Sequence, residues 1–426
     1  MFSTPEHPKE GGLVAVYPGT DPKAKAVLLL AHVDVVEAKR EDWTRDPFTL
    51  VEANGFFYAR GAADDKSIAA IWVDSLIRMK REGYRPRRSV KLALTCGEET
   101  TYAFTGAEWL ANNKRDLIDA AFALNEGGGG RLDANGKPEA LSLQVGEKAS
   151  QNYTLLVTNP GGHSSRPVRP SAIAQLAAAV QKVEAYEFPV HLNPVTTAFF
   201  EQTGKALGGE RGAAMQRIAA NPQDSAADAI VSSDPSYHSM LRTTCVPTLL
   251  SAGHANNSLP QRATANINCR IAPGETPAEV KAVLERAIGD TAVSVEIVPP
   301  IRPTPGSPPL DPKVIEPGRK LAAEMFPGVP LVPVMSTGAT DGIFLFAKGI
   351  PVYGVPGIFG EADGNGTHGL NGAHPREVAA GRPRLPVQVG QDLRRRALSA
   401  AARSADWPRF NPRRPGPVRD RGRGAG

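Results

Sequence analysis

The sequence is poor in cysteine, since its 426 residues include only Cys96, Cys245 and Cys269. An odd number of cysteines does not form a complete disulfide framework, and their spacing is not that of a zinc finger. We therefore interpret all three as packing residues.

Long apolar runs are also absent. No run approaches the roughly 20 residues that a membrane-spanning helix needs, and the opening MFSTPEHPKEGG lacks the basic-then-apolar pattern of a signal peptide. We expect no membrane contact and a cytoplasmic location for the chain as encoded. A start codon farther upstream would instead allow a periplasmic or secreted protein.

Lysine is missing from the C-terminal segment 372–426, which carries thirteen arginines and four acidic residues, a net charge of +9. Because the whole chain carries +5, residues 1–371 carry −4. A mildly acidic body does not favour nucleic acid, so we expect no nucleic-acid partner. We expect the Arg/Pro-rich tail 372–426 to be disordered.

The hydrophobic content of 41% is enough for a large core, and the length indicates two or more domains. Apolar runs of strand length alternate with helical patterns in the first 130 residues. An example is the run from Val27 to Ala31, followed by a helix expected from about Ser67 to Gly83. This alternation predicts an α/β fold with a mostly parallel sheet.

Polar residues follow each of the expected strands. His32 and Asp34 follow the first strand, Glu98 and Glu99 the second, and Glu126 the third. Because the carboxyl ends of parallel strands share one edge of a sheet, we expect these side chains to lie together.

Asp64 lies on a tight Gly/Ala turn before a helix, where both of its oxygens are free to bridge two cations. Taken alone, Asp64 is more often a helix cap, and Glu98 and Glu99 are more often a solvated surface pair. Together with His32 these acids are the ligands that Zn²⁺ takes in a site with an open position. Two zinc ions bring a charge of +4, and three carboxylates with a bridging hydroxide bring −4, so a buried cluster would be neutral.

Five motifs occur in the order HVD, RGAADDK, GEE, NEGG and THGLN. This set, over roughly residues 13–371, resembles the di-zinc exopeptidase family of acetylornithine deacetylase, succinyl-diaminopimelate desuccinylase, aminoacylase and glutamate carboxypeptidase. The phrases DWTRDPF, GGHSSRP and ANNSLP are most similar to the carboxypeptidase S branch.

The resemblance implies two Zn²⁺ ions per subunit, with Co²⁺ or Mn²⁺ as substitutes. The metal ligands that it implies are His32, Asp64, Glu99, Glu126 and His368, with Asp64 bridging the two ions. Glu98 would be the general base, and Asp34 would orient His32 by accepting its other ring N–H.

The middle of the chain predicts an α+β lid at residues 149–300, between catalytic segments 1–148 and 301–371. The lid includes a helix with Thr276 as N-cap and Glu279 at the capping-box position. An insert at about 186–244 shows no period from which its structure can be predicted.

The resemblance also implies substrate-binding residues in the lid. His163 in GGHSSRP would polarise the scissile carbonyl, commonly from a partner subunit, and Asn257 and Arg270 would hold a free carboxylate of the substrate. An ordinary loop histidine and a surface salt bridge are the alternatives for His163 and Arg270. A homodimer through the lid is a further expectation.

The sequence therefore predicts a zinc-dependent exopeptidase that hydrolyses a peptide or N-acyl amide bond beside a free carboxylate. The alternative is an inactive or destabilised family member.

The C-terminal segment differs from the pattern of the family. Relatives continue from His-Gly-Leu-Asn into a Glu and an amphipathic helix, whereas a Pro/Arg-rich segment follows Asn371 here. A one-base insertion near codon 371 would explain the difference, because suitable codons for residues 372–392 encode such a helix when read out of frame.

Overall fold

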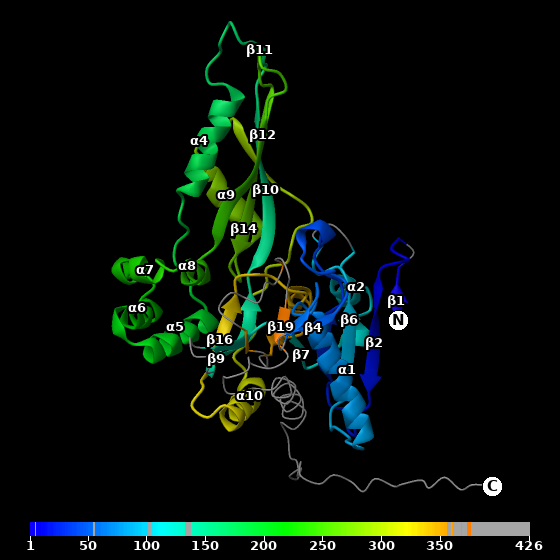
Figure 1. Ribbon diagram of the computed structural model, residues 1–426. Coiled ribbons are helices and arrows are strands. Elements are labelled where there is room, and N and C mark those ends of the chain that lie inside the picture. Colours follow the sequence, from blue (N-terminus) through cyan, green and yellow to red (C-terminus); the bar gives the residue numbers. More distant parts are fainter. Residues whose placement is uncertain are drawn as a thin grey trace, which may run out of the picture.

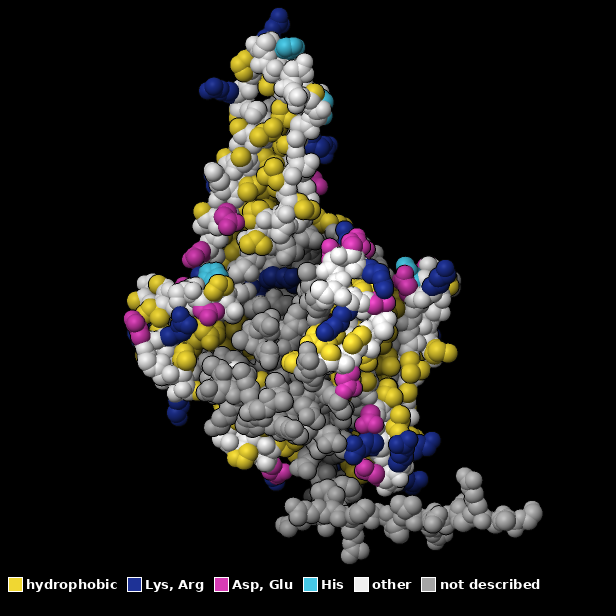
Figure 2. Space-filling view, viewed as in Figure 1, with side chains coloured by type: hydrophobic (Ala, Val, Ile, Leu, Met, Phe, Trp, Pro, Cys, Tyr) yellow, Lys and Arg dark blue, Asp and Glu magenta, His cyan; other side chains and the backbone are white. Residues whose placement is uncertain are grey.

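The computed structural model describes residues 1–4, 6–53, 56–100, 104–132, 138–355, 359–360, 368 and 373–375. Figure 1 shows a body built around a large sheet, with a long arm projecting from it. Figure 2 shows a hollow between the arm and the body, with basic side-chain surface (dark blue) inside it. The arm consists of residues from the segment 149–300, for which the sequence analysis predicted a lid, and we call it the lid.

A ten-stranded sheet forms the body among the described residues, in the order β1-β2-β6-β3-β7-β17-β9-β8-β18, with β16 beside β9. Its strands are β1 (Phe2–Ser3), β2 (Gly11–Tyr17), β3 (Val27–His32), β6 (Val90–Thr95), β7 (Phe122–Asn125), β8 (Gly129–Leu132), β9 (Pro138–Glu147), β16 (Leu331–Ser336), β17 (Val352–Gly354) and β18 (Phe359–Gly360). Strands β6, β3, β7 and β17 run parallel to one another. The predicted α/β class with a mostly parallel sheet is confirmed.

Helix α1 (Lys66–Arg81) shows why this sheet forms where the sequence predicted it. All six residues of β3 are buried, and α1 buries Ile68, Ile71 and Trp72 in the same core. Burial of each such side chain contributes roughly 1.5–3 kcal/mol. Nε1 of Trp72 also donates to the carbonyl of Leu30 at 3.1 Å, which fixes α1 against β3.

The body has further helices and strands. They are 3-10 helix η1 (Arg40–Asp42), strands β4 (Val51–Ala53), β5 (Phe56–Tyr58) and β19 (Ala373–Pro375), and helices α2 (Gly106–Asn113), α3 (Arg115–Ile118), α10 (Pro312–Met325) and α11 (Gly342–Ala347). Strand β19 pairs with β5, so the expected disorder of the tail does not hold for residues 373–375. The other residues of the tail, and the segment next to codon 371, lie outside the described residues.

The lid is an antiparallel sheet with helices on one face. Its strands are β10 (Ala149–Thr158), β12 (Thr244–Ala252), β14 (Arg262–Ile271) and β15 (Val293–Ile297), and its helices are α4 (Ala172–Glu184) and α9 (Pro277–Ile288). Residues of β10 alternate, so that Tyr153 and Leu155 are buried under the helices while Asn152 lies on the uncovered face. The predicted capping box of Thr276 and Glu279 at α9 is confirmed.

Four helices make up the insert, whose structure the sequence analysis did not predict. They are α5 (Pro194–Leu207), α6 (Gly209–Ala220), α7 (Ser225–Val231) and α8 (Pro235–Leu241), and they enclose a small core of their own. Helix α5 packs against β16 of the body. The sequence contained signals for the N-termini of two of these helices. Asn193 caps α5 and Asp234 caps α8, and each is followed by a proline at the first helical position.

The interpretation of the cysteines was wrong for two of the three. Cys245 of β12 lies opposite Cys269 of β14, with 4.0 Å between their Cα atoms, and the two form a disulfide. The antiparallel register brings together residues that are 24 positions apart in the sequence. Cys96 is free.

No helix in the described ranges is long and apolar enough to cross a membrane.

Candidate metal centre

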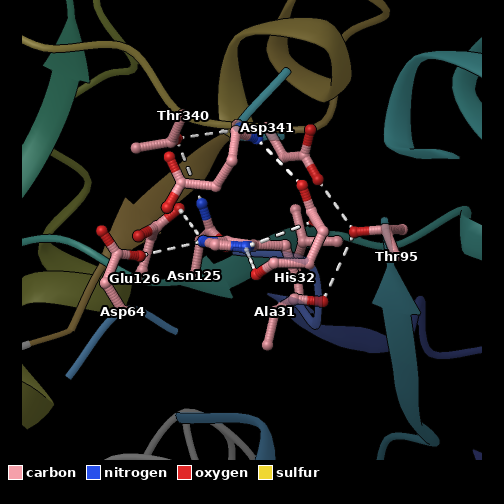
Figure 3. A network of polar contacts seen from close by, with 12 residues as sticks. Ala31, His32, Asp64, Thr95, Asn125, Glu126, Thr340 and Asp341 are labelled. Atoms are coloured by element: carbon pink, nitrogen blue, oxygen red, sulfur yellow. Dashed lines mark hydrogen bonds and ion pairs between the residues drawn. The ribbon is translucent and has the colours of Figure 1, made fainter. Parts of the chain in front are cut away.

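The carboxyl ends of three parallel strands bring predicted ligands together. His32 is the last residue of β3, Glu99 follows β6, and Glu126 directly follows β7. In Figure 3, His32, Asp64 and Glu126 point toward one another at this edge of the sheet. The strand order thus produces the cluster that the sequence predicted.

Asp64 lies between the two histidines, in the turn between β5 and α1. Its Oδ1 is 3.0 Å from Nε2 of His32, and its Oδ2 is 3.0 Å from Nε2 of His368. One carboxylate oxygen therefore faces each histidine, as a bridging ligand requires.

Two groups of three residues share Asp64. The ligand atoms of His32, Asp64 and Glu126 lie within 4.8 Å of one another, and so do those of Asp64, Glu99 and His368. Nε2 of His32 is 3.7 Å from Oε1 of Glu126, and Nε2 of His368 is 3.2 Å from Oε1 of Glu99. Each group offers one nitrogen and two carboxylates, a donor set that fits zinc with an open position.

The electrostatics of this cluster favour bound cations. Burial, followed by the charge of Asp65, raises the pKa of Glu126 well above its usual value. Burial opposes the charging of His32, but hydrogen bonds with Asp34 and Asp64 raise its pKa far above its usual range. Carboxylates held this close in a partly desolvated site are stabilised by positive charge between them.

Glu98 directly precedes Glu99 in the sequence, and both residues line a pocket. Its ligand atom lies within 4.8 Å of those of His32 and Glu99. Burial, and then the charge of Asp341, raise the pKa of Glu98 to about 8, against the lowering effect of His32. A carboxyl group with a pKa near neutrality is suited to take up and release a proton.

Asp34, which the sequence analysis expected to accept the other ring N–H of His32, lies next to that ring. Its backbone carbonyl is 3.2 Å and its Oδ1 3.5 Å from Nδ1 of His32, and its Oδ2 accepts from the backbone N–H of Glu99 at 3.1 Å. Burial raises the pKa of Asp34, but the hydrogen bonds from His32 and Glu99 lower it by more than burial raises it. The pKa of Asp34 is therefore below its usual value. Asp34 therefore contacts a residue from each ligand group.

Asp341 is a buried acid near the site that the sequence analysis did not single out. Its Oδ2 accepts from Oγ1 of Thr95 at 2.8 Å (Figure 3), and burial raises its pKa to about 6. Beside it, Oγ1 of Thr340 accepts from Nδ2 of Asn125 at 3.1 Å. The available signal was position, because Asp341 follows β16 in the way that the ligands follow their strands.

A pocket of about 430 Å³ lies between the metal cluster and the lid. The body contributes Glu98 and His368 to its lining, and the lid contributes Asn152, Asn268 and Arg270. Within the part of the chain that the structure describes, no hydrogen bond or ion pair joins the guanidinium of Arg270 to another group. A partly buried guanidinium without an acidic partner is suited to bind an anion.

The structure does not bring His163 and Asn257 to this pocket. Both are exposed, and they lie together at the tip of the lid, where the N–H of Ser164 donates to the carbonyl of Asn257 at 3.0 Å. His163 ends β11 (Gly162–His163), and Asn257 directly precedes β13 (Ser258–Leu259), which pairs with β11. Figure 1 places β11 at the end of the arm farthest from the body, so Asn257 and Arg270 do not share one ligand within a single chain.

Comparison with known proteins adds two kinds of similarity. The model of peptidase family M20/M25/M40 matches residues 28–375. The N-fatty-acyl-amino acid synthase/hydrolase of Homo sapiens is 32% identical over 334 residues, which are 76% of this chain and 65% of the relative. A probable carboxypeptidase S-like protein of Dictyostelium discoideum is 30% identical over 340 residues, 77% of this chain and 64% of the relative. The chain thus spans less than two thirds of either relative.

Solved structures share the fold. An M20 family metallo-carboxypeptidase from Sulfolobus solfataricus superposes with a TM-score of 0.63 at 19% identity, over 92% of this chain and 87% of that chain. At this identity the likeness supports the arrangement of body and lid and nothing finer.

Proposed function

Because the chain belongs to peptidase family M20/M25/M40, we propose that it is a zinc-dependent hydrolase that cleaves a peptide or N-acyl amide bond next to a free carboxylate. One observation carries the proposal. One pocket is lined both by Glu99 and His368, which belong to one of the two ligand groups that share Asp64, and by Arg270 of the lid. Such a pocket can hold an amide bond near the metal ligands while it binds an anionic end of the same molecule.

The proposed metal ligands divide into two sets. His32, Asp64 and Glu126 would hold one Zn²⁺, and Asp64, Glu99 and His368 would hold the other. When bound, the ions supply the Lewis acidity that amide hydrolysis requires. Co²⁺ or Mn²⁺ could occupy the same oxygen and nitrogen ligands.

Three residues of this chain would do the remaining work. Glu98 would take a proton from the attacking water and deliver it to the leaving nitrogen, since it lines the pocket beside the ligands. Arg270 would bind the free carboxylate with the two parallel hydrogen bonds that a guanidinium can form. The backbone carbonyl of Asp34 would hold the ring of His32 in a fixed orientation by accepting from Nδ1.

The names of the relatives agree with this reaction class. An N-fatty-acyl-amino acid and the substrate of a carboxypeptidase both carry an amide bond beside a free carboxylate. The acyl or side-chain preference is a finer property, because one methylene in a pocket changes discrimination by only roughly 1–3 kcal/mol.

The lid tip suggests a second part of the proposal. His163 and Asn257 are exposed at the end of the arm, so we propose that they act in the pocket of a second copy in a homodimer. This arrangement would give both residues a role although they lie far from the ligand groups of their own chain.

Metal content and turnover together test the main proposal. The purified chain should bind close to two zinc ions, hydrolyse members of a panel of N-acyl amino acids and dipeptides, and lose activity with a chelator. Amidated forms of the same compounds should be poor substrates. Full zinc occupancy without turnover on any compound would support the alternative, an inactive family member.

A further inference from the structure

Two adjacent residues at the boundary between body and lid point into different parts of the molecule. Glu147 ends β9 of the body, and Lys148 lies directly before β10 of the lid. We call Glu147 and Lys148 the hinge pair. Neither residue has a role in the proposed reaction, although both carry ionisable groups in the interior.

The carboxylate of Glu147 is fixed to the body beside the metal cluster. Its Oε2 accepts from Oγ1 of Thr340 at 2.8 Å and from Nε2 of Gln144 at 3.1 Å. The hydroxyl of Thr340 in turn accepts from Nδ2 of Asn125, which precedes the proposed ligand Glu126. One residue of the hinge pair is therefore tied to the metal-binding edge of the sheet.

The ammonium group of Lys148 is fixed to the insert and the lid. The residue has no solvent exposure, and its Nζ lies 2.9–3.2 Å from the carbonyl and hydroxyl of Ser239, the carbonyl of Arg242 and the hydroxyl of Thr244. Its backbone N–H donates to Ser336 of the body at 3.0 Å. A buried ammonium without a carboxylate partner is costly, and an apolar side chain would fill this space at lower cost.

The contacts of Lys148 lead to Arg270. Thr244, which accepts from Lys148, lies directly opposite Arg270 in the pairing of β12 with β14. The next residues, Cys245 and Cys269, are joined by the disulfide, and Oγ1 of Thr243 accepts from the N–H of Ala272 at 2.8 Å. The start of β12 is therefore fastened to β14 on both sides of Arg270.

We propose that Glu147 and Lys148 are positioning residues, which hold the guanidinium of Arg270 at a fixed place opposite the metal cluster. The series of contacts runs from Thr340 through the hinge pair to Thr244 and then to Arg270. This inference rests on the proposed function, in which Arg270 binds the carboxylate of the substrate. It implies that loosening the hinge pair impairs recognition of that carboxylate, whereas the groups that act on the amide bond remain in place.

The first test replaces Lys148 by methionine, which keeps the length of the side chain and removes its hydrogen bonds. The KM for a free-acid substrate should rise about tenfold, because a small misplacement of a binding group is costly. The kcat, the zinc content and the poor activity on the amidated substrate should stay close to those of the parent. The matched control is Lys182→Met, since Lys182 binds a carbonyl of Ile288 elsewhere in the lid, and it should change neither constant.

A double-mutant cycle separates positioning from general stability. In an Arg270→Ala background, Lys148→Met should cause no further loss of preference for the acid over the amide. Equal losses on acid and amide in both backgrounds would overturn the proposal. If Lys148→Met does not fold, Thr244→Val is the second variant, because it removes one acceptor of Lys148 at nearly constant volume. It should raise the KM for the acid about threefold. An unchanged KM for this variant also overturns the proposal.

Amide hydrogen exchange tests the hinge pair even if the parent hydrolyses nothing and the proposed function fails. Exchange in residues 244–252 and 262–271 should be faster in Lys148→Met than in the parent, and unchanged in Lys182→Met. Unchanged exchange in Lys148→Met would contradict the positioning role independently of any activity.

Discussion

Glu98 and Glu99 are neighbours in the sequence with different surroundings in the structure. Glu99 lies 3.2 Å from Nε2 of His368, whereas Glu98 lines the pocket near Asp341. We expect Glu98→Gln to keep both metal ions and lose nearly all turnover, because an amide cannot accept the proton of water. Glu99→Gln should lose metal from one site.

Metal analysis and turnover of the two variants check this assignment. Near-normal turnover in Glu98→Gln would show that another group is the base, and full metal occupancy in Glu99→Gln would remove Glu99 from the ligands. Asp74→Asn is a suitable control, since this residue lies on α1 outside the site.

Lys148 predicts a pH dependence of stability with a definite sign. Burial, and then the charge of Arg270, lower the pKa of Lys148 from 10.5 to about 7. Between these values the unfolded chain holds more protons than the folded chain, so the contribution of Lys148 to the free energy of unfolding rises with pH. That contribution is lost as the pH falls through about 7.

Urea unfolding at pH 7, 8 and 9 measures this effect. The parent should gain stability relative to Lys148→Met by up to about 1.4 kcal/mol per pH unit. All other groups titrate alike in both proteins, so a constant difference across this range would mean that Lys148 keeps its ordinary pKa.

At the scale of elements, the helical insert depends on its caps. The side chain of Asn193 accepts from the N–H groups of Val195 and Thr196 at the start of α5. Asn193→Ala should lower the free energy of unfolding by about 1 kcal/mol, because two backbone donors lose their partner. Asn193→Asp keeps the accepting oxygen and should unfold near the parent in the same denaturant series; an equal loss in both variants would assign the effect to packing.

The elements that could be predicted are those with local signals. The buried run of β3, the periodic pattern of α1 and the capping box of α9 are each written within a few residues. The proximity of His32 and Glu126 was predictable for a related reason, since both follow strands whose parallel order places their ends at one edge.

Contacts between distant strands could not be predicted in the same way. The disulfide of Cys245 with Cys269 requires the register of β12 against β14, and no short pattern specifies a register. The approach of Arg270 to Glu98 depends on the angle between lid and body, which contacts such as those of Lys148 determine. The distance of His163 from the body could not be predicted either, because it depends on how far the strands of the lid extend from the body.

At the scale of the whole molecule, the proposed homodimer makes a test by complementation possible. Glu98→Gln and His163→Ala should each be almost inactive, because one lacks the base and the other lacks the residue supplied to the partner. A mixed dimer of the two should regain up to about a quarter of the parent activity when equal amounts are refolded together, since one pocket in half of the dimers is complete. Activity after mixing and the mass of the parent in solution are the measurements.

The absence of any recovery, together with a monomeric mass, would contradict the dimer. In that case His163 would be an ordinary exposed residue at the tip of the lid.

The helical insert cannot be removed from this chain without a change at Lys148. The insert leaves the lid near residue 186 and returns at β12, so it resembles a module that could be removed without touching the sheet. However, three of the four acceptors of the buried Lys148 belong to Ser239 and Arg242, which lie within that module. A shortened chain would leave the ammonium without them, so a viable deletion of the four helices must also replace the lysine by an apolar residue. Relatives without these helices should show the same paired replacement.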